Sequence, residues 1–295
     1  MLRKLCLLSL SAIILCGCNI AANATENKVP YLELNNGLKM PQFGLGTFML
    51  DDKNGEAYNA VLAALKLGYR HIDTAHGYGN ERSVGKAIKD SKIPREDIWV
   101  TSKLWPTEYE DVENALDKML NRLGLDYIDL VYLHQPVGNY DKAWESLIEA
   151  QKQGKVKAIG ISNFDKVESI FDSFIKTATI KPQAMQLECH PYAQRVHWQK
   201  KLKKYGIVQE NWYPLGGRQS NGLILKDPVI NEIAKTHNKS AAQIIIRWHI
   251  QKGFAVIPGT SNPDYIKENI EVFDFKLTKD EMKKIEKLNT EVRIF

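Results

Sequence analysis

Four side chains with acid–base chemistry stand at or just after the ends of three short apolar segments. Asp73 ends one segment and Tyr78 follows it, while Lys103 and His134 end the next two. A tyrosine exchanges protons poorly at neutral pH, but a nearby ammonium favours its ionised form and a carboxylate keeps that ammonium charged. A histidine can hydrogen-bond a substrate carbonyl. The four together predict proton transfer during carbonyl reduction, which also needs a hydride from a cofactor because no side chain supplies one.

Each of these residues also has an ordinary structural role. A strand-end Asp often caps the next helix, Lys103 can extend over an apolar surface, and Tyr78 can pack as a surface aromatic. His134 can be a hydrogen-bonded core histidine. The catalytic interpretation therefore depends on whether the fold brings all four to one place.

The elements that would position these residues alternate regularly along the chain. Short apolar runs occupy residues 43–46, 71–73, 98–104, 130–134, 158–162, 184–188, 207–212 and 255–258. Amphipathic helical patterns between them include residues 56–67, 112–123, 143–153, 166–176, 196–205 and 241–251. Strands separated by helices pair in parallel, since each crossover needs a helix-sized connection, and eight such units suit a closed barrel.

We therefore predict a single α/β domain over residues 29–295, a (β/α)8 TIM barrel whose active site lies at the C-terminal ends of the strands. Residues 31–34 and 38–40, joined by an Asn-Asn-Gly turn, predict an N-terminal β-hairpin that closes the barrel bottom. A doubly wound dinucleotide-binding fold is the alternative, but the Gly-Leu-Gly at residues 44–46 lacks the third glycine of that fingerprint.

Longer motifs around the four residues carry a family resemblance. They are GYRHIDTAHGYGNERSVG at 68–85, TSKLW at 101–105, LHQP at 133–136, GISNF at 160–164 and QLECHPY at 186–192. With these motifs in order, the chain resembles the aldo-keto reductases, in particular bacterial members of the diketogluconate-reductase type. The resemblance implies NAD(P)H-dependent reduction of aldehydes or ketones to alcohols. By this resemblance Tyr78 is the general acid, Lys103 and Asp73 support it, and His134 orients the substrate.

The resemblance also implies a set of cofactor and substrate contacts. Ser162, Asn163 and Gln186 match residues that hydrogen-bond the nicotinamide carboxamide. Trp212 stands where many relatives stack a tyrosine on the nicotinamide. Further cofactor contacts are expected at Thr47, Leu215, Thr260 and Asn269, and substrate contacts at His134, Phe48 and Trp105.

Two departures from the family pattern concern the 2′-phosphate that distinguishes NADPH from NADH. Gly259 stands where relatives commonly have a phosphate-binding Lys, and Tyr265 where they have an Arg. Charge-assisted hydrogen bonds of this kind contribute about 1.5–3 kcal/mol each, so their loss predicts weakened NADPH preference and substantial use of NADH. Lys267 is a candidate to compensate from the following helix.

The substrate pocket is less defined by the sequence. The chain stops at Phe295, soon after a helical segment at residues 279–288, whereas relatives with wide substrate range often carry a longer C-terminal loop. This predicts an open pocket that favours small aldehydes, α-dicarbonyls or keto sugars.

Other classes of function fit less well. The net charge is +5, but no basic patch is interleaved with aromatic residues, so we expect no nucleic-acid binding. The residues Glu188, Cys189, His190 and His197 match no zinc-ligand spacing, so we expect no metal. A catalytically silent nicotinamide-nucleotide-binding barrel, acting as sensor or subunit, is the main alternative; a sugar-binding barrel is a third. By analogy with relatives we expect a monomer.

Residues 1–28 read as a leader and polar stretch rather than as part of the fold. Arg3 and Lys4 precede an apolar stretch, residues 5–15, that is too short to span a bilayer. Gly17-Cys18 resembles a bacterial lipobox, whereas the Ala-Asn-Ala at 22–24 fits an ordinary cleavage site. We expect an exported bacterial protein lipidated at Cys18, or a cytoplasmic enzyme if the start codon is misassigned.

Overall fold

The computed structural model describes residues 29–295 of the chain. The predicted leader, with the expected lipidation at Cys18, lies outside the described residues. Within residues 29–295 no helix has both the length and the apolar character needed to cross a membrane.

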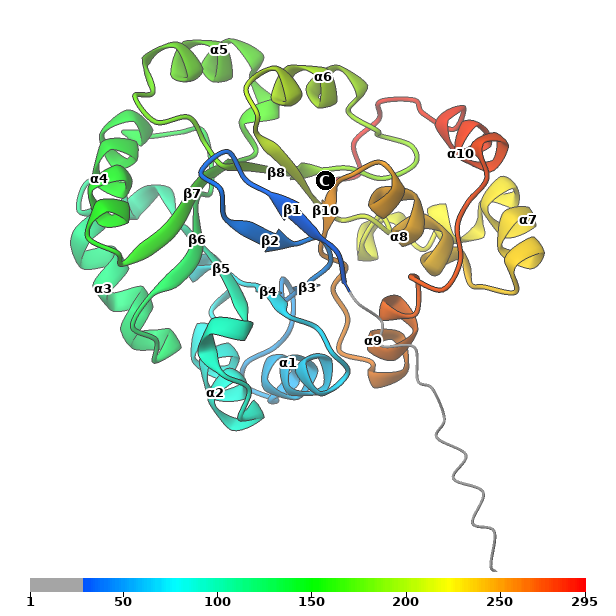
Figure 1. Cartoon of the computed structure of the whole chain (residues 1–295), viewed down its shortest axis with the longest axis horizontal. Coiled ribbons are helices and arrows are strands. Elements are labelled where there is room, and N and C mark those ends of the chain that lie inside the picture. The colour runs from blue at the N-terminus through cyan, green and yellow to red at the C-terminus, as the bar shows by residue number, and fades with distance from the viewer. Residues whose placement is uncertain (1–28) are drawn as a thin grey trace, which may run out of the picture.

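Eight parallel strands form a barrel surrounded by helices (Figure 1). They are β3 (Leu45–Gly46), β4 (His71–Asp73), β5 (Trp99–Leu104), β6 (Ile128–Leu133), β7 (Val156–Ser162), β8 (Ala184–Glu188), β9 (Val208–Trp212) and β10 (Ala255–Val256). Each strand pairs in parallel with the next one along the chain. A parallel bridge between Phe43 and Val256 joins the first strand to the last, with 3.0 Å hydrogen bonds from Gly44 N to Val256 O and from Val256 N to Gln42 O. The predicted (β/α)8 barrel is confirmed.

A helix accompanies every crossover, as parallel pairing requires. The helices of the repeating units are α1 (Glu56–Lys66), α2 (Glu81–Ser91), α3 (Val112–Leu123), α4 (Tyr140–Lys152), α5 (Glu168–Thr177), α6 (Val196–Lys204), α8 (Ala241–Gln251) and α9 (Pro263–Ile270). Two more helices, α7 (Pro228–His237) and α10 (Lys279–Glu286), are added to this pattern. Helix α7 starts at Pro228 because the Asp227 carboxylate accepts hydrogen bonds from Val229 N (2.8 Å) and Ile230 N (3.1 Å).

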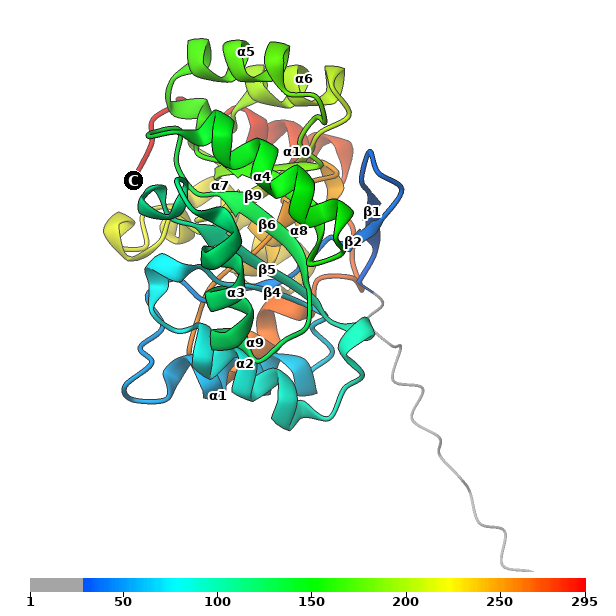
Figure 2. The same cartoon turned by 90° about the vertical axis from the view of Figure 1, so that its left-hand side faces the viewer.

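A β-hairpin covers the end of the barrel where the strands begin. Strands β1 (Tyr31–Glu33) and β2 (Lys39–Pro41) pair antiparallel, as predicted. Leu34 and Met40 are buried against the first residues of several barrel strands, among them Trp99 and Ala184. Figure 2 shows the hairpin at one end of the molecule and the C-terminus at the opposite end. The hairpin thus seals the barrel bottom and leaves the C-terminal ends of the strands for a site.

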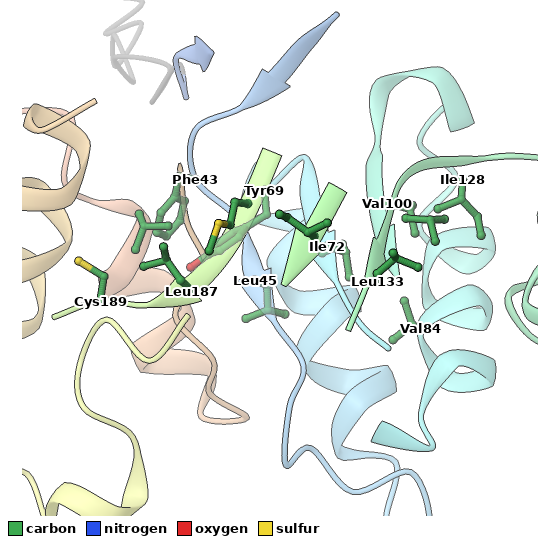
Figure 3. Close-up of a cluster of buried hydrophobic side chains, with 14 of the residues drawn as sticks. Phe43, Leu45, Tyr69, Ile72, Val84, Val100, Ile128, Leu133, Leu187 and Cys189 are labelled. Carbon is green, nitrogen blue, oxygen red and sulfur yellow. The ribbon is translucent and has the colours of Figure 1, made fainter. Parts of the chain in front are cut away.

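The main hydrophobic core lies between the barrel strands and the surrounding helices. Figure 3 shows part of it, including Val100 of β5, Leu133 of β6 and Val84 of α2, all fully buried. Burying apolar surface at about 25 cal/mol per Å² is the main stabilising contribution to such a fold. Cys189 is a free, buried cysteine in this core.

Candidate active site

A cavity of about 630 Å3 lies at the C-terminal ends of the barrel strands. Its walls come from residues at the ends of the strands and from the loops that follow them. Eleven of the sequence-predicted residues line it: Phe48, Asp73, Tyr78, Trp105, His134, Ser162, Asn163, Gln186, Trp212, Leu215 and Thr260. The fold therefore brings the predicted catalytic, cofactor and substrate residues to one place.

Lys103 and Asp73 form a buried ion pair beneath this cavity. The Lys103 Nζ donates to both Asp73 carboxylate oxygens, at 2.7 and 2.8 Å, and to Thr74 O at 2.9 Å. Neither side chain is more than 2% exposed. Burial opposes the charged ammonium, but the neighbouring Asp73 and Tyr78 outweigh it and raise the pKa of Lys103. Lys103 is therefore held as a fixed cation.

Tyr78 lies above this cation, at the end of the 3-10 turn His76–Tyr78 that follows β4. The Lys103 Nζ is 4.8 Å from the centroid of the Tyr78 ring. The charge of Lys103 lowers the pKa of Tyr78, as expected, but it does not set the net direction. Burial raises the pKa to about 12, because it outweighs the opposing charge of Lys103. Tyr78 is thus a protonated phenol at neutral pH, suited to donate a proton.

His134 lies beside Tyr78 and Trp105. Its ring centroid is 5.9 Å from that of Tyr78 and 5.0 Å from that of Trp105, both edge-on. Burial, together with the charges of Lys103 and Lys166, lowers the pKa of His134 to about 3. The imidazole is therefore neutral at physiological pH.

The polar side chains that end β7 and β8 have a defined set of free hydrogen-bonding groups. Asn163 Nδ2 donates to His134 O (3.0 Å) and Ser162 Oγ (3.1 Å), while Asn163 Oδ1 is buried without a partner within the described residues. Gln186 Nε2 donates to Asp73 Oδ2 (2.8 Å) and Glu210 Oε2 (2.6 Å), which uses both amide hydrogens and leaves Gln186 Oε1 as an acceptor. Two acceptors and the Ser162 hydroxyl donor therefore remain on the cavity wall.

An aromatic wall faces these polar groups. Trp212 lies at the end of β9, and Phe295 packs edge-on against it with ring centroids 5.5 Å apart. Phe295 is also 5.4 Å from Tyr213 and 6.1 Å from Phe48 by ring centroids. The C-terminal residues thus form part of the pocket wall, which the sequence analysis did not foresee, and the predicted openness of the pocket stays a prediction.

The tail is held in this position by buried charges. Glu188 Oε1 accepts hydrogen bonds from Ile294 N (2.6 Å) and Phe295 N (3.2 Å). Arg293 donates to Glu188 Oε2 (3.1 Å) and to Asp165 Oδ2 (2.9 Å). No local sequence signal marks these contacts, because Arg293 lies more than a hundred residues from both partners in the chain.

One end of the cavity lacks the Lys and Arg side chains that commonly bind a 2′-phosphate in relatives, as the sequence indicates. Gly259, Ser261 and Tyr265 line it, and Tyr265 is 56% exposed. A Cβ atom at Gly259 would lie 2.7 Å from Gly46 O, so a side chain at this position would push the loop after β10 away from β3. Arg218, which the sequence analysis did not identify, lines the same cavity from the loop after β9. Lys267, the candidate compensating cation, does not line the cavity.

Two predicted cofactor contacts do not line the cavity. Thr47 is fully buried, and its hydroxyl donates to Asp73 O at 2.9 Å. Asn269 is 3% exposed within α9. Their expected contacts with the cofactor therefore stay predictions.

Comparison with known proteins agrees with this geometry. Residues 42–290 match the model of the "Aldo/keto reductase family". The chain belongs to the aldo/keto reductase family. Curated aldo/keto reductase relatives include a 9,11-endoperoxide prostaglandin H2 reductase of Trypanosoma cruzi, 43% identical over 88% of this chain and 92% of that protein. A glyoxal reductase of Bacillus subtilis is 42% identical over 89% of this chain and 94% of that protein.

Solved structures of aldo/keto reductases match as well. An aldo-keto reductase of Bombyx mori, solved in complex with NADP, superposes with a TM-score of 0.85 at 31% identity, over 91% of this chain and 95% of that one. The chain is thus an NAD(P)H-dependent aldo/keto reductase, an oxidoreductase that acts on aldehydes or ketones. Among residues 29–295 no group of three or more His, Cys, Asp or Glu side chains could hold a metal ion.

Proposed function

We propose that this protein reduces small aldehydes or ketones to alcohols, with Tyr78 as the general acid and a nicotinamide cofactor bound across the cavity. One observation carries the proposal: the free groups of Ser162, Asn163 and Gln186 match a nicotinamide carboxamide. The two acceptors, Asn163 Oδ1 and Gln186 Oε1, suit its NH2 group, and the Ser162 hydroxyl suits its carbonyl oxygen. These groups stand on the wall shared with His134 and Tyr78.

The remaining residues suit the other parts of the cofactor. Trp212 supplies an aromatic surface for the nicotinamide ring, and Arg218 a cation for the pyrophosphate. When bound, the reduced nicotinamide supplies the hydride that no side chain can supply. Asn163 Oδ1 is buried and has no hydrogen-bond partner among residues 29–295, and such a ligand would supply one.

The residues around the substrate carbonyl then have separate tasks. Neutral His134 orients the carbonyl oxygen by a hydrogen bond, and Tyr78 donates its proton to that oxygen as the carbonyl is reduced. The Lys103 ammonium stabilises the phenolate that Tyr78 becomes, and Asp73 keeps the ammonium in place. Phe48, Trp105 and Phe295 give the substrate an apolar surface to pack against.

We further propose that NADH is a substantial cofactor. The cavity end at Gly259, Ser261 and Tyr265 presents hydroxyl and aromatic groups in place of the cations that bind a 2′-phosphate.

The experiment that tests the function compares wild type with Tyr78→Phe. Purified protein is mixed with NADH or NADPH and with methylglyoxal or benzaldehyde, and cofactor oxidation is followed by absorbance. General acid catalysis contributes about 10²–10⁴-fold, so we expect Tyr78→Phe to lower kcat by that factor while the cofactor Kd stays within about threefold. Equal turnover by the variant would refute the assigned role of Tyr78.

A further inference from the structure

A carboxylic acid inside the barrel, Glu210 of β9, contacts the nicotinamide site from behind. Glu210 is 0% exposed and does not line the cavity. Its Oε2 accepts hydrogen bonds from Gln186 Nε2 at 2.6 Å and from Tyr132 Oη at 2.9 Å. Burying a carboxylic acid is costly unless it is hydrogen-bonded, as Glu210 is. Neither the proton transfer nor the substrate binding proposed above uses Glu210.

Glu210 and Asp73 hold the Gln186 amide between them. Asp73 Oδ2 accepts one amide hydrogen at 2.8 Å and Glu210 Oε2 accepts the other at 2.6 Å. An amide nitrogen has two hydrogens, so both are used and the plane of the amide is fixed by two points. The carbonyl oxygen, Gln186 Oε1, is thereby presented as an acceptor, while a flipped amide would place an oxygen against two carboxyl oxygens.

We propose that Glu210 is a positioning residue for the cofactor: it fixes Gln186 so that its Oε1 accepts a hydrogen bond from the carboxamide NH2 of the nicotinamide. The inference rests on the proposed function, because it assumes that a nicotinamide occupies this wall. It also links the cofactor site to the proton-transfer residues, since the Asp73 carboxylate that holds Lys103 accepts the other Gln186 hydrogen.

The contact does not depend on the charge of Glu210. Burial raises the pKa of Glu210, against the opposing effects of Gln186, Lys103 and Tyr132. Glu210 Oε1 has no hydrogen-bond partner in the described part of the chain and lies 3.4 Å from His71 Nε2, so a proton on Oε1 leaves Oε2 free to accept. A neutral amide at position 210 can accept the Gln186 hydrogen in the same way, which makes Glu210→Gln the conservative variant.

The test compares two ligands that differ only in the group Gln186 is inferred to recognise. These are NAD+ and 3-acetylpyridine adenine dinucleotide, in which a methyl group replaces the carboxamide NH2. If the wild-type protein binds NADP+ more tightly than NAD+, NADP+ and the 2′-phosphorylated acetylpyridine analogue are compared instead. Kd values are measured by quenching of tryptophan fluorescence for wild type, Glu210→Met and Glu210→Gln. The matched control is Gln42→Met. Gln42 is buried next to the hairpin, and its side-chain amide donates hydrogen bonds to Ile250 O and Phe254 O.

We expect Glu210→Met to weaken NAD+ binding about tenfold, because the released amide can turn a hydrogen toward the carboxamide NH2. Its affinity for the acetylpyridine analogue should stay within about twofold, and Glu210→Gln should bind both ligands within about threefold of wild type. Equal weakening of both ligands in Glu210→Met, or no weakening of NAD+, would overturn the inference while leaving the proposed function standing. Wild type that binds neither ligand would overturn the proposed function itself.

Discussion

Tyr78 keeps its proton in this site because burial raises its pKa to about 12 despite the Lys103 ammonium beside it. The consequence differs for the two directions of the reaction. Carbonyl reduction uses the protonated phenol, which is fully populated at neutral pH. Alcohol oxidation uses the phenolate as a base. As long as the pH is below the pKa of Tyr78, the phenolate population increases tenfold for each unit by which the pH rises.

The pH dependence of the two directions should therefore differ. Between about pH 6 and 9 we expect kcat/KM for reduction to be flat, since Tyr78 stays protonated and His134, with a pKa lowered to about 3, stays neutral. For alcohol oxidation kcat/KM should rise about tenfold per unit toward alkaline pH. Steady-state rates in both directions over one buffer series give the measurement. A reduction profile that falls through a group titrating near neutrality would contradict the assignment.

Replacing Tyr265 tests which of NADH and NADPH the site prefers. Tyr265→Arg places a guanidinium at an exposed position on the cavity edge, where a 2′-phosphate can pair with it. We expect NADPH affinity to rise about tenfold and NADH affinity to change by less than about threefold. Tyr265→Leu is the control that removes the ring without adding charge. Lys at position 259 is the poorer choice because its Cβ would lie 2.7 Å from Gly46 O.

The sequence predicts the role of a single residue where that residue ends a strand of a repeating β/α unit. Tyr78, Lys103 and His134 were identified because polar residues at the ends of barrel strands converge, and the structure brings them together. The role inferred for Glu210 was not predictable. A charged residue inside an apolar run is visible in the sequence, but its partners Gln186 and Tyr132 belong to other strands and only the folded barrel sets them against it.

The elements were predicted because apolar periodicity repeats in each unit. Strands β4 and β8 and helices α3 and α8 have the predicted limits, whereas β10 ends two residues earlier than its apolar run. That run continues as Ile257-Pro258, and Pro258 O accepts from Gly46 N (3.1 Å) without regular strand pairing. The return of residues 289–295 to the cavity was missed because ion pairs distant in sequence, not periodicity, direct it.

The C-terminal tail, residues 289–295, depends on the ion pairs of Arg293. Arg293→Met removes the hydrogen bonds to Glu188 and Asp165, so residues 291–295 should detach and carry Phe295 away from the pocket. We expect KM for benzaldehyde to rise about three- to tenfold while the cofactor Kd is nearly unchanged.

Phe295→Ala separates the two contributions of the tail. It removes the aromatic wall and keeps the ion pairs, so it should reproduce the effect of Arg293→Met on KM. An unchanged KM in both variants would mean that the tail does not bound the substrate site.

The predicted leader, residues 1–28, bears on where the protein functions. We propose from the lipobox-like sequence that the protein is exported and lipidated at Cys18. Cells grown with radiolabelled palmitate should yield a labelled, membrane-associated protein, and Cys18→Ala should lose the label. A labelled Cys18→Ala variant, or unlabelled wild type in the cytosolic fraction, would contradict this prediction.

The stability of the whole barrel should report cofactor binding, because the site draws on residues from β7 to β10 and on the loops between them. A ligand that binds the native state alone stabilises it by about 2.7 kcal/mol at a concentration of 100 Kd. For a domain of this size that corresponds to a rise in Tm of roughly 5–10 °C.

Thermal unfolding with NADH, NADPH and ADP-ribose at equal concentrations then separates the parts of the site. NADH should raise Tm at least as much as NADPH, because neither Gly259 nor Tyr265 offers a cation to a 2′-phosphate. ADP-ribose should raise Tm less, because it lacks the carboxamide that suits Ser162, Asn163 and Gln186. A shift confined to NADPH would refute the proposed use of NADH, and equal shifts with NADH and ADP-ribose would show that these three residues do not bind the nicotinamide.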